Sequence, residues 1–337
     1  MPKNREHSPE VSRDKIAVGK YHPVDISSFR HLYPFTSHYR LLNGFNYHYI
    51  DQGQGDPIVM VHGNPTWSFY FRELITALSP NFRTIVPDHI GCGLSDKPDP
   101  EAYAYSLKNR VDDLENLLKN GQIRNNITLI MHDWGGMIGM AYAVRHPEQI
   151  RRIVIMNTYA FLPPSAKRIP LAAYFIRKTG VLASLAVLGL NLFSIGALYL
   201  ATHKKLTKEV KKGLTAPYNC WHNRIAVLKF VQDIPLSPTD ASYELVKQVD
   251  ENIYRFGNVP MLICWGEHDF VFDFDYLAEW QRRFPDAEIH RFPDAGHYVL
   301  EDVPEKIVPL IDRFLGRHPR DEDRIQRTEG RKQKPDD

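Results

Sequence analysis

The segment that limits the folds open to this chain is an apolar strand at Thr128–Met131 that runs directly into a turn and an apolar helix. The turn reads His132-Asp133-Trp134, followed by two glycines. Glycines here remove the Cβ atoms that would clash where a strand and the next helix pack closely. A strand, a sharp turn and a helix in immediate succession present one side chain at the tip of a sheet. In this chain that side chain is the carboxylate of Asp133, and no G-x-S-x-G motif occurs.

Short apolar runs alternate with helical patterns along most of the chain. The runs are rich in β-branched and aliphatic residues, and several end at Gly, Asn or Asp. They predict strands at Tyr47–Ile50, Pro57–His62, Arg83–Pro87, Ile127–His132, Ile153–Asn157, Met261–Trp265 and Glu288–Phe292. Helices are predicted at Trp67–Leu78, Leu107–Lys119, Met137–Arg145 and Asp275–Phe284. The alternation favours an α/β fold with a mostly parallel central sheet flanked by helices, and sites in such sheets form at the carboxyl ends of strands.

The same pattern divides the chain into a core, an insertion and two flanking segments. Residues 39–158 and 236–317 carry the strand signals and form the predicted core. Residues 159–235 show no strand signal, so we predict an inserted helical cap there. Residues 1–38 are predicted to lie across the core as an N-terminal arm. Residues 318–337 hold six basic and six acidic side chains and almost nothing apolar, so we expect a disordered tail.

Charge and composition exclude several classes of protein. Among 337 residues, 42 basic and 40 acidic side chains give a net charge of +2, which is not the electrostatic footprint of a nucleic-acid binder. The three cysteines are odd in number and far apart, and the N-terminus has no apolar signal segment, so we expect a cytoplasmic protein. No H-E-x-x-H, P-loop or G-x-G-x-x-G motif occurs, and the sequence implies no metal and no cofactor.

Two further residues, a base and an acid that orients it, are predicted to act together with Asp133. A carboxylate can displace a leaving group from a saturated carbon, and the resulting ester then needs a base that activates water. His297 follows the last predicted strand, where the histidine of such a set stands in chain order. No Asp or Glu occurs between positions 148 and 209, so the acid that orients His297 must follow the next strand, and we choose Asp269. Its rivals in the same loop are Glu267 and Asp273.

A leaving anion needs hydrogen-bond donors. Asn64 follows an apolar strand, and Trp134 stands next to Asp133. The Asn64 amide and the Trp134 indole N–H are neutral donors, which suit a weakly hydrated anion such as chloride or bromide in an apolar site. The backbone N–H groups of both residues are predicted to form an oxyanion hole for ester hydrolysis. The alternatives are simple packing for Trp134 and capping of the next helix for Asp133.

Five runs of sequence carry a family resemblance: HGNPTWSFYFR, DHIGCGLSDKP, MHDWGGMIG, WGEHDFVFD and DAGHYVLED. Over about residues 35–317 they resemble the haloalkane dehalogenase family of α/β-hydrolases. The asparagine–tryptophan pair and the acid after the late strand are similar to the third subfamily. Within it, NTYAF, NRIAVLKFVQDIPL and DFVFD resemble the β-lactone decarboxylases of long-chain olefin biosynthesis, which share the same nucleophile, base and donor positions. Met131 stands where the general turn has a small residue.

The resemblance implies an α/β-hydrolase with an Asp-His-Asp triad and a small apolar substrate. Our first prediction is haloalkane hydrolysis, in which Asp133 displaces halide and the alkyl ester is hydrolysed to an alcohol. The alternative is β-lactone decarboxylation with the same residues. An epoxide hydrolase would need cap tyrosines, a fluoroacetate-type dehalogenase resembles His-Asp-Arg where this chain has Trp134, and a binding protein would leave Asp133 unreactive. The tyrosines available to an epoxide hydrolase are Tyr174, Tyr199 and Tyr218.

The predicted cap contains an uncharged stretch from Thr179 to Thr202. Its central residues, Val181–Leu200, are numerous enough to span a bilayer. A single crossing would place Asp133 and His297 on opposite sides of the membrane, so we predict no transmembrane span. We expect instead a pair of buried helices over an apolar pocket, with homo-oligomer formation through this stretch as the alternative. The following basic run, His203–Lys212, is predicted to be a solvated helix face, with attachment to a membrane surface as the minor alternative.

Overall fold

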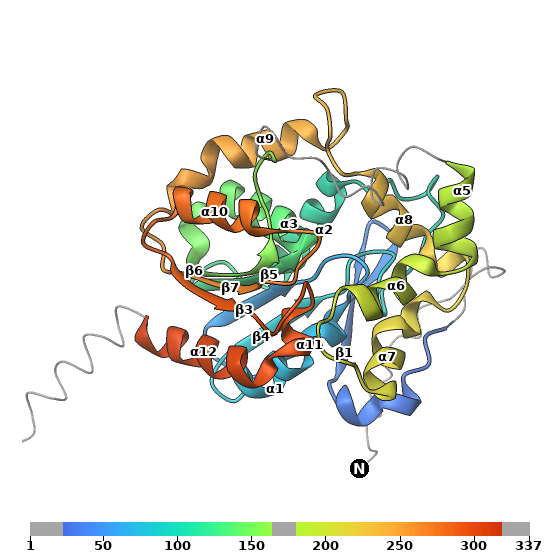
Figure 1. Ribbon diagram of the computed structural model, residues 1–337, viewed down its shortest axis with the longest axis horizontal. Helices are drawn as coiled ribbons and strands as arrows, with labels where there is room; N and C mark the ends of the chain where they lie inside the picture. Colours follow the sequence, from blue (N-terminus) through green and yellow to red (C-terminus); the bar gives the residue numbers. More distant parts are fainter. Residues whose placement is uncertain (1–22, 164–179, 319–337) are drawn as a thin grey trace, which may run out of the picture.

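One sheet of eight strands organises the computed structural model, which describes residues 23–163 and 180–318 (Figure 1). The strand order is β1-β2-β4-β3-β5-β6-β7-β8. β2 pairs antiparallel with both of its neighbours, and all other neighbouring strands are parallel, so the predicted mostly parallel sheet is confirmed. The strands are β1 (Ser37–Leu42), β2 (Phe45–Gln52), β3 (Pro57–Val61), β4 (Arg83–Pro87), β5 (Ile127–Asp133), β6 (Ile150–Thr158), β7 (Met261–Gly266) and β8 (Glu288–Phe292).

All seven predicted strands are present, and β1 is the strand that the sequence analysis missed. β1 lies at the edge of the sheet and pairs only with β2. Its side chains are mostly half-buried or exposed, and Tyr39 and Leu41 face solvent. An edge strand with little burial lacks the apolar run that marks the central strands, so its pairing partner defines it more than its own sequence does.

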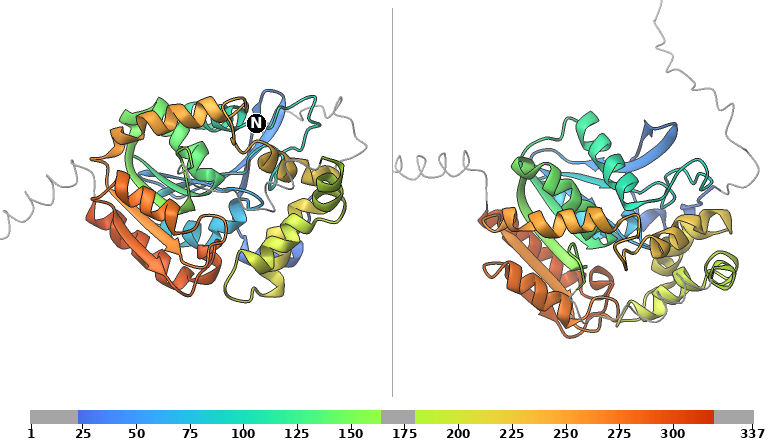
Figure 2. Two further views of the ribbon diagram at one scale, coloured as in Figure 1. Left: turned by 45° about the horizontal axis from the view of Figure 1, so that its top comes forward. Right: turned by 90° about the horizontal axis from the view of Figure 1, so that it is seen from above.

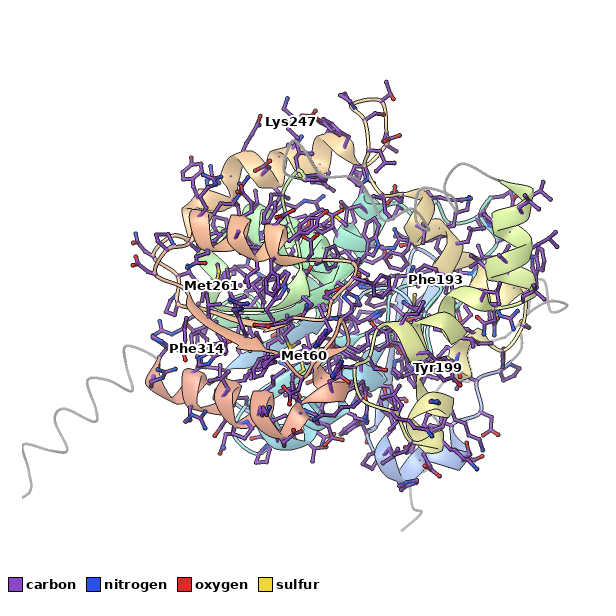
Figure 3. All side chains as sticks on the ribbon, in the orientation of Figure 1. Met60, Phe193, Tyr199, Lys247, Met261 and Phe314 are labelled. Carbon is purple, nitrogen blue, oxygen red and sulfur yellow. The ribbon has the colours of Figure 1, made fainter. Side chains whose placement is uncertain are left out.

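Helices cover both faces of the sheet (Figures 1 and 2). Two separate clusters of buried apolar side chains fill the spaces between the sheet and these helices. The helices of one face are α2 (Leu107–Asn120), α3 (Trp134–Arg145), α9 (Tyr243–Asn252) and α10 (Phe274–Arg283). Those of the other face are α1 (Arg72–Leu78), α11 (Val299–Asp302) and α12 (Pro304–Arg317), preceded along the chain by the short turns η1 (Ser27–Leu32) and η2 (Ser68–Phe71). Figure 3 shows side chains of this core, including Met60 on β3 and Phe314 on α12.

The described part of the N-terminal segment packs onto the core through aromatic rings. Phe29 and Tyr33 are buried, and both contact the Trp67 ring, with centroid separations of 6.4 and 5.0 Å. The Tyr33 hydroxyl shares a 2.6 Å hydrogen bond with the hydroxyl of Ser68. The rest of the predicted arm, residues 1–22, and nearly all of the predicted tail lie outside the described residues.

Helices and turns without a strand fill the described part of the chain between β6 and α9, and we call residues 180–234 the cap. In Figures 1 and 2 the cap helices are grouped beside one end of the sheet. The elements are α5 (Val181–Ser184), η4 (Leu185–Gly189), α6 (Leu192–Leu200), α7 (Lys208–Thr215), η5 (Ala216–Tyr218), η6 (His222–Arg224) and α8 (Ile225–Gln232). Among the described residues no single helix is long and apolar enough to cross a membrane, although α5–η4 and α6 together have the length and composition and are bent by 68°.

The prediction that Val181–Leu200 forms buried helices is wrong for one side of these helices. Ala183, Val187 and Leu198 are buried, but eight large apolar side chains of the same stretch are exposed. An uninterrupted apolar composition does not show which side of a helix is covered, because that depends on the elements that happen to lie beside it.

A buried ion pair joins α1 to α11, the short helix that follows His297. The two terminal guanidinium nitrogens, Nη1 and Nη2, of Arg72 on α1 donate to the carboxylate of Glu301 on α11, at 2.6 and 2.7 Å. Both side chains are almost fully buried. Since α11 begins two residues after His297, this pair ties the loop that carries His297 to the rest of the core.

We predict that Glu301→Gln lowers the free energy of unfolding by about 3 kcal/mol, because the buried Arg72 charge then keeps only the more distant, exposed carboxylate of Glu73. The control is Glu305→Gln, whose exposed ion pair with Lys204 should contribute less than about 1 kcal/mol. Urea unfolding curves of both variants measure the difference. Equal shifts in the two midpoints would contradict this account of the ion pair.

Candidate active site

Asp133 ends β5 and precedes α3 in a strained backbone conformation. Its φ is 52° and its ψ is −126°, in a region that non-glycine residues rarely adopt. The side chain is buried and makes no capping hydrogen bond to α3. The carboxylate is therefore directed away from the helix that follows it, which disfavours a role for Asp133 as a helix cap.

Neighbouring backbone approaches this turn so closely that two positions accept only glycine. A Cβ atom at Gly135 would clash with the carbonyl oxygen of Val61, and one at Gly63 would clash with the Asp133 carboxylate. The hydroxyl of Thr158 donates a hydrogen bond to the Asp133 carbonyl from β6. The ends of β3 and β6, the two strands on either side of β5, thus hold the turn in its strained conformation.

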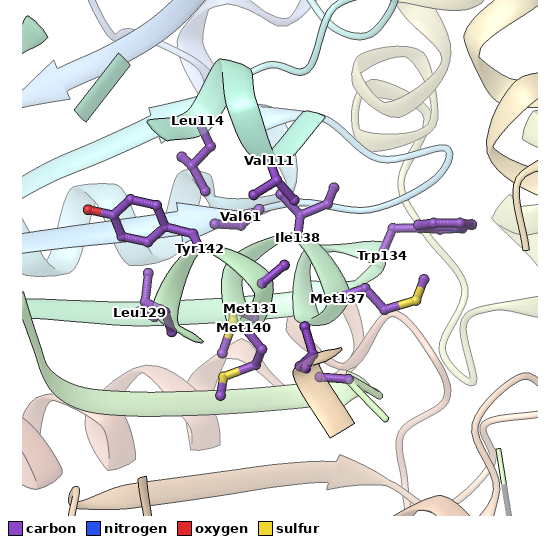
Figure 4. Close-up of a cluster of buried hydrophobic side chains, with 14 of the residues drawn as sticks. Val61, Val111, Leu114, Leu129, Met131, Trp134, Met137, Ile138, Met140 and Tyr142 are labelled. Carbon is purple, nitrogen blue, oxygen red and sulfur yellow. The ribbon is translucent and has the colours of Figure 1, made fainter. Parts of the chain in front are cut away.

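The apolar side chains around β5 and α3 explain the large residue before the turn (Figure 4). Met131 packs against the helix at Gly139, where any Cβ atom would clash with the methionine sulfur. A small residue on the helix therefore compensates for the large residue on the strand. Figure 4 also shows Trp134 and Met137 at the end of α3 that adjoins the turn.

The structure brings Asp133, His297 and Asp269 together at the carboxyl ends of β5, β7 and β8. The Nδ1–H of His297 donates a 2.8 Å hydrogen bond to Oδ2 of Asp269. On its other side, Nε2 of His297 lies 3.5 Å from Oδ2 of Asp133. All three side chains are buried. The imidazole can therefore exchange a proton with a group at Asp133 while Asp269 fixes its orientation.

Both carboxylate oxygens of Asp269 accept hydrogen bonds in addition to the one from His297. The backbone N–H groups of Val271 and Phe272 donate to its Oδ1, at 2.7 and 3.1 Å. The amide of Asn157, at the end of β6, donates to its Oδ2 at 2.9 Å. The two rival acids are engaged elsewhere. Glu267 forms an ion pair with Arg291, and Asp273 caps α10.

The two carboxylates change the proton affinity of His297. Burial by itself would lower the pKa of His297, but the charges of Asp269 and Asp133 and their hydrogen bonds raise it to about 10. Burial would raise the pKa of Asp133, but the hydrogen bond and the charge of His297 outweigh it and lower this pKa overall. The raised pKa of His297 thus favours its imidazolium form beside Asp133 and Asp269.

The donors predicted from sequence lie beside the Asp133 carboxylate. The backbone N–H of Asn64 donates to Oδ1 of Asp133 at 2.6 Å. The side-chain amide of Asn64 uses one N–H on the carbonyl of Val227 in α8, at 3.1 Å, which leaves its second N–H for a ligand. The Trp134 indole packs against Phe230 of the cap, and its N–H has no acceptor among the described residues.

Three contacts were missed by the sequence analysis. Asn157 was predicted only as the last residue of a strand, yet its amide holds Asp269 and its Oδ1 accepts from the Gly266 N–H. His132 donates from Nε2 to the His297 carbonyl at 2.8 Å, and burial and the nearby His297 lower the pKa of His132 to about 3. The buried guanidinium of Arg110 lies 3.6 Å from the centre of the Phe230 ring. Only the position of His132 beside Asp133 gave any signal in the sequence.

Neither of the two described cap tyrosines, Tyr199 and Tyr218, is placed as an epoxide hydrolase needs. Tyr199 is 64% exposed on the outer side of α6. Tyr218 is buried, but its hydroxyl donates to the carbonyl of Thr66. Tyr174 lies outside the described residues. The described tyrosines therefore do not favour epoxide hydrolysis.

Two surface hollows, of about 310 and 240 Å³, lie away from these residues. Both are lined mainly by polar side chains and backbone, and neither includes a residue of the site. Within residues 23–163 and 180–318, no group of three or more His, Cys, Asp or Glu side chains has the geometry of a metal site.

Comparison with known proteins identifies similar chains. The alpha/beta hydrolase fold family matches residues 56–304. A cis-3-alkyl-4-alkyloxetan-2-one decarboxylase from Shewanella oneidensis is 51% identical over 84% of this chain and 89% of its own length. A haloalkane dehalogenase from Mycobacterium tuberculosis is 31% identical over 86% of this chain and 99% of its own. The solved haloalkane dehalogenase DatA from Agrobacterium tumefaciens superimposes with a TM-score of 0.75 and 26% identity, over 84% of this chain and 97% of its own.

The charges around His297 predict a large fall in its pKa when Asp269 loses its charge. In Asp269→Asn, we expect the pKa of His297 to fall well below about 10, because burial then opposes the positive charge with only Asp133 against it. Titration of the imidazole by nuclear magnetic resonance measures this pKa. Glu267→Gln, in the same loop, is the control and should leave the pKa unchanged. A pKa that moves only in the Glu267 variant would show that the orienting acid was misassigned.

Proposed function

The chain belongs to the alpha/beta hydrolase family that includes haloalkane dehalogenases and cis-3-alkyl-4-alkyloxetan-2-one decarboxylases, and on this basis we propose that it decarboxylates cis-3,4-dialkyl β-lactones with Asp133 as nucleophile. The observation that carries this choice is the much greater identity to the decarboxylase than to the dehalogenase. It reverses the order of the two activities predicted from sequence. Both activities are supported by relatives of this chain, and β-lactone decarboxylation has the stronger support.

In the proposed first step the Asp133 carboxylate attacks C4 of the lactone ring. The C4–O bond breaks, its electron pair stays on the departing carboxylate oxygen, and Asp133 becomes an alkyl ester. No proton is taken up or released. The Asn64 N–H that contacts Oδ1 of Asp133 keeps the carboxylate oriented for attack. The indole N–H of Trp134 and the second amide N–H of Asn64 are the donors for the oxygen that leaves the ring.

In the second step the new carboxylate leaves as carbon dioxide. The electrons of its C–C bond form the alkene, and the ester C–O bond breaks, which restores the Asp133 carboxylate. Inversion at C4 followed by anti elimination converts a cis lactone into a cis alkene. The step needs neither water nor a base. The positive charge of His297 stabilises the Asp133 carboxylate as the ester C–O bond breaks.

Haloalkane hydrolysis is the second candidate, because the same Asp133 can displace a halide. The alkyl ester formed from a haloalkane has no carboxylate to lose, so it needs water and a base. Esterification removes the negative charge of Asp133, which is one of the causes that raise the pKa of His297. His297 then releases its proton more readily and acts as the base. The geometry thus permits dehalogenation as a slower reaction of the same residues.

We further propose a cytoplasmic location. Cys92 and Cys264 are buried and form no disulfide. Unpaired thiols are typical of proteins in reducing compartments.

The first test is competition between a cis-β-lactone with two long alkyl chains and 1-bromobutane. We expect kcat/KM for the lactone to be higher by on the order of a hundredfold or more, because each buried methylene contributes about 0.8 kcal/mol. Gas chromatography of the alkene and an assay for bromide measure both reactions. The alkene should be cis. Rapid bromide release with an inert lactone would restore dehalogenation as the main activity.

A second test separates the fates of the two esters. His297→Phe should accumulate a butyl ester on the peptide that contains Asp133 after exposure to 1-bromobutane, because no base remains to activate water. The same variant should show no lasting adduct with the lactone, since that ester decarboxylates by itself. Mass spectrometry of the digested protein measures the adducts, and Asp133→Ala is the control. Failure of the His297 variant to be alkylated, beside an active wild type, would argue against the two-step scheme.

A further inference from the structure

The outer side of the cap is the main apolar surface of the described chain. Of the fourteen large hydrophobic side chains that are exposed among the described residues, eight lie between positions 181 and 200. A ninth, Trp221, adjoins them, because its ring lies 3.4 Å from where a Cβ of Gly189 would stand. We call this set the cap apolar surface. Its members are Val181, Leu182, Leu185, Leu190, Leu192, Ile195, Tyr199, Leu200 and Trp221.

The same helices are firmly attached to the protein on their inner side. Ala183, Val187 and Leu188 are buried in a small cluster with side chains of α8. The guanidinium of Arg224 donates to the carbonyl of Leu188 at 2.5 Å. The amide of Asn191, between η4 and α6, donates to the carbonyl of Tyr218 at 3.3 Å. The exposed side is therefore the outer face of a packed layer, and the apolar residues on it do not contribute to the core.

A basic helix lies directly beside this surface. The segment His203–Lys212, which includes the start of α7, has five lysines and one glutamate. The ammonium of Lys211 lies 4.1 Å from the centre of the Tyr199 ring, so the basic and apolar residues meet at that point (Figure 3 labels Tyr199). Among the described residues only Lys204 of these lysines is in an ion pair. Lysines at the edge of an apolar surface are complementary to anionic lipid headgroups.

The shape of the cap suits the surface of a bilayer and not its full thickness. Val181–Gly189 and Leu192–Leu200 are bent by 68° relative to each other. Each is about 14 Å long at 1.5 Å per residue, roughly half of the hydrocarbon thickness. From the exposed apolar side chains, the adjacent lysines and the bent helix pair, we propose that the cap apolar surface docks on an anionic membrane, with its helices lying in the plane of the interface.

The cap apolar surface lies close to the site, so docking would bring the site close to the membrane. α8 packs against the inner side of the surface, and its Val227 carbonyl holds the amide of Asn64. One layer of cap side chains thus separates the membrane-facing residues from the site. A long-chain lactone and the hydrocarbon product both partition into lipid, so docking would shorten their transfer. This purpose rests on the proposed function, whereas the docking itself does not.

The test measures sedimentation of the full chain with vesicles. Wild type should bind vesicles that contain phosphatidylglycerol more strongly than pure phosphatidylcholine vesicles. Leu190→Ser/Leu200→Ser, which alters two residues that are each 66% exposed, should lower the vesicle partition coefficient by on the order of tenfold. Lys205→Glu/Lys208→Glu should remove the preference for anionic vesicles.

The matched control is Leu41→Ser/Tyr254→Ser, which alters similarly exposed side chains that are not part of the cap apolar surface and should bind like wild type. Circular dichroism melting curves of all variants check that each is folded, and sedimentation velocity without lipid measures self-association. Absence of vesicle binding by wild type, or equal binding by the cap variant, would overturn the proposal. Wild-type oligomers that the cap substitutions dissociate, with no vesicle binding, would identify the surface as an interface between copies of the chain.

Discussion

His297 lies between the buried carboxylates of Asp133 and Asp269, and the need to stabilise these charges away from water determines much of the surrounding structure. A buried charge is costly unless paired and hydrogen-bonded. Asp269 receives two backbone N–H groups and the amide of Asn157, and Asp133 receives the backbone N–H of Asn64. These donors come from the loops that follow β3 and β7 and from the end of β6. A parallel sheet supplies them at one place because its strands all end at the same edge.

The local sequence predicted the parts of this arrangement that depend on neighbours in the chain. The central strands and the turn at Asp133 have strong local patterns, and the gap in carboxylates between positions 148 and 209 pointed to Asp269. The partners of these residues were not predictable in the same way. Asn157 and Asp269 are far apart in sequence and meet only because β6 and β7 are neighbours in the sheet. The edge strand β1 and the exposure of the cap helices likewise depend on which elements lie beside them.

Under the proposed function, one nucleophile with two outcomes would link this chain to both kinds of enzyme that it resembles. The proposed attack of Asp133 is common to lactones and haloalkanes, and the fate of the proposed ester depends on whether the substrate brings its own carboxylate. His297 suits both outcomes because its proton affinity depends on the charge of Asp133. While Asp133 is ionised or becoming so, the imidazolium stabilises it. Once Asp133 is esterified, His297 can act as a base.

The central claim, that Asp133 attacks carbon and is released by decarboxylation, is tested most directly by turnover in water enriched in heavy oxygen. Hydrolysis of an alkyl ester adds water at the Asp133 carbonyl carbon and leaves a water oxygen in the carboxylate. Decarboxylation breaks the alkyl–oxygen bond and leaves both original oxygens in place. We therefore expect mass spectrometry to find heavy oxygen in the Asp133 peptide after turnover of 1-bromobutane and none after turnover of the lactone. Label in Asp133 after lactone turnover, or butanol that carries heavy oxygen beside an unlabelled Asp133, would contradict the account.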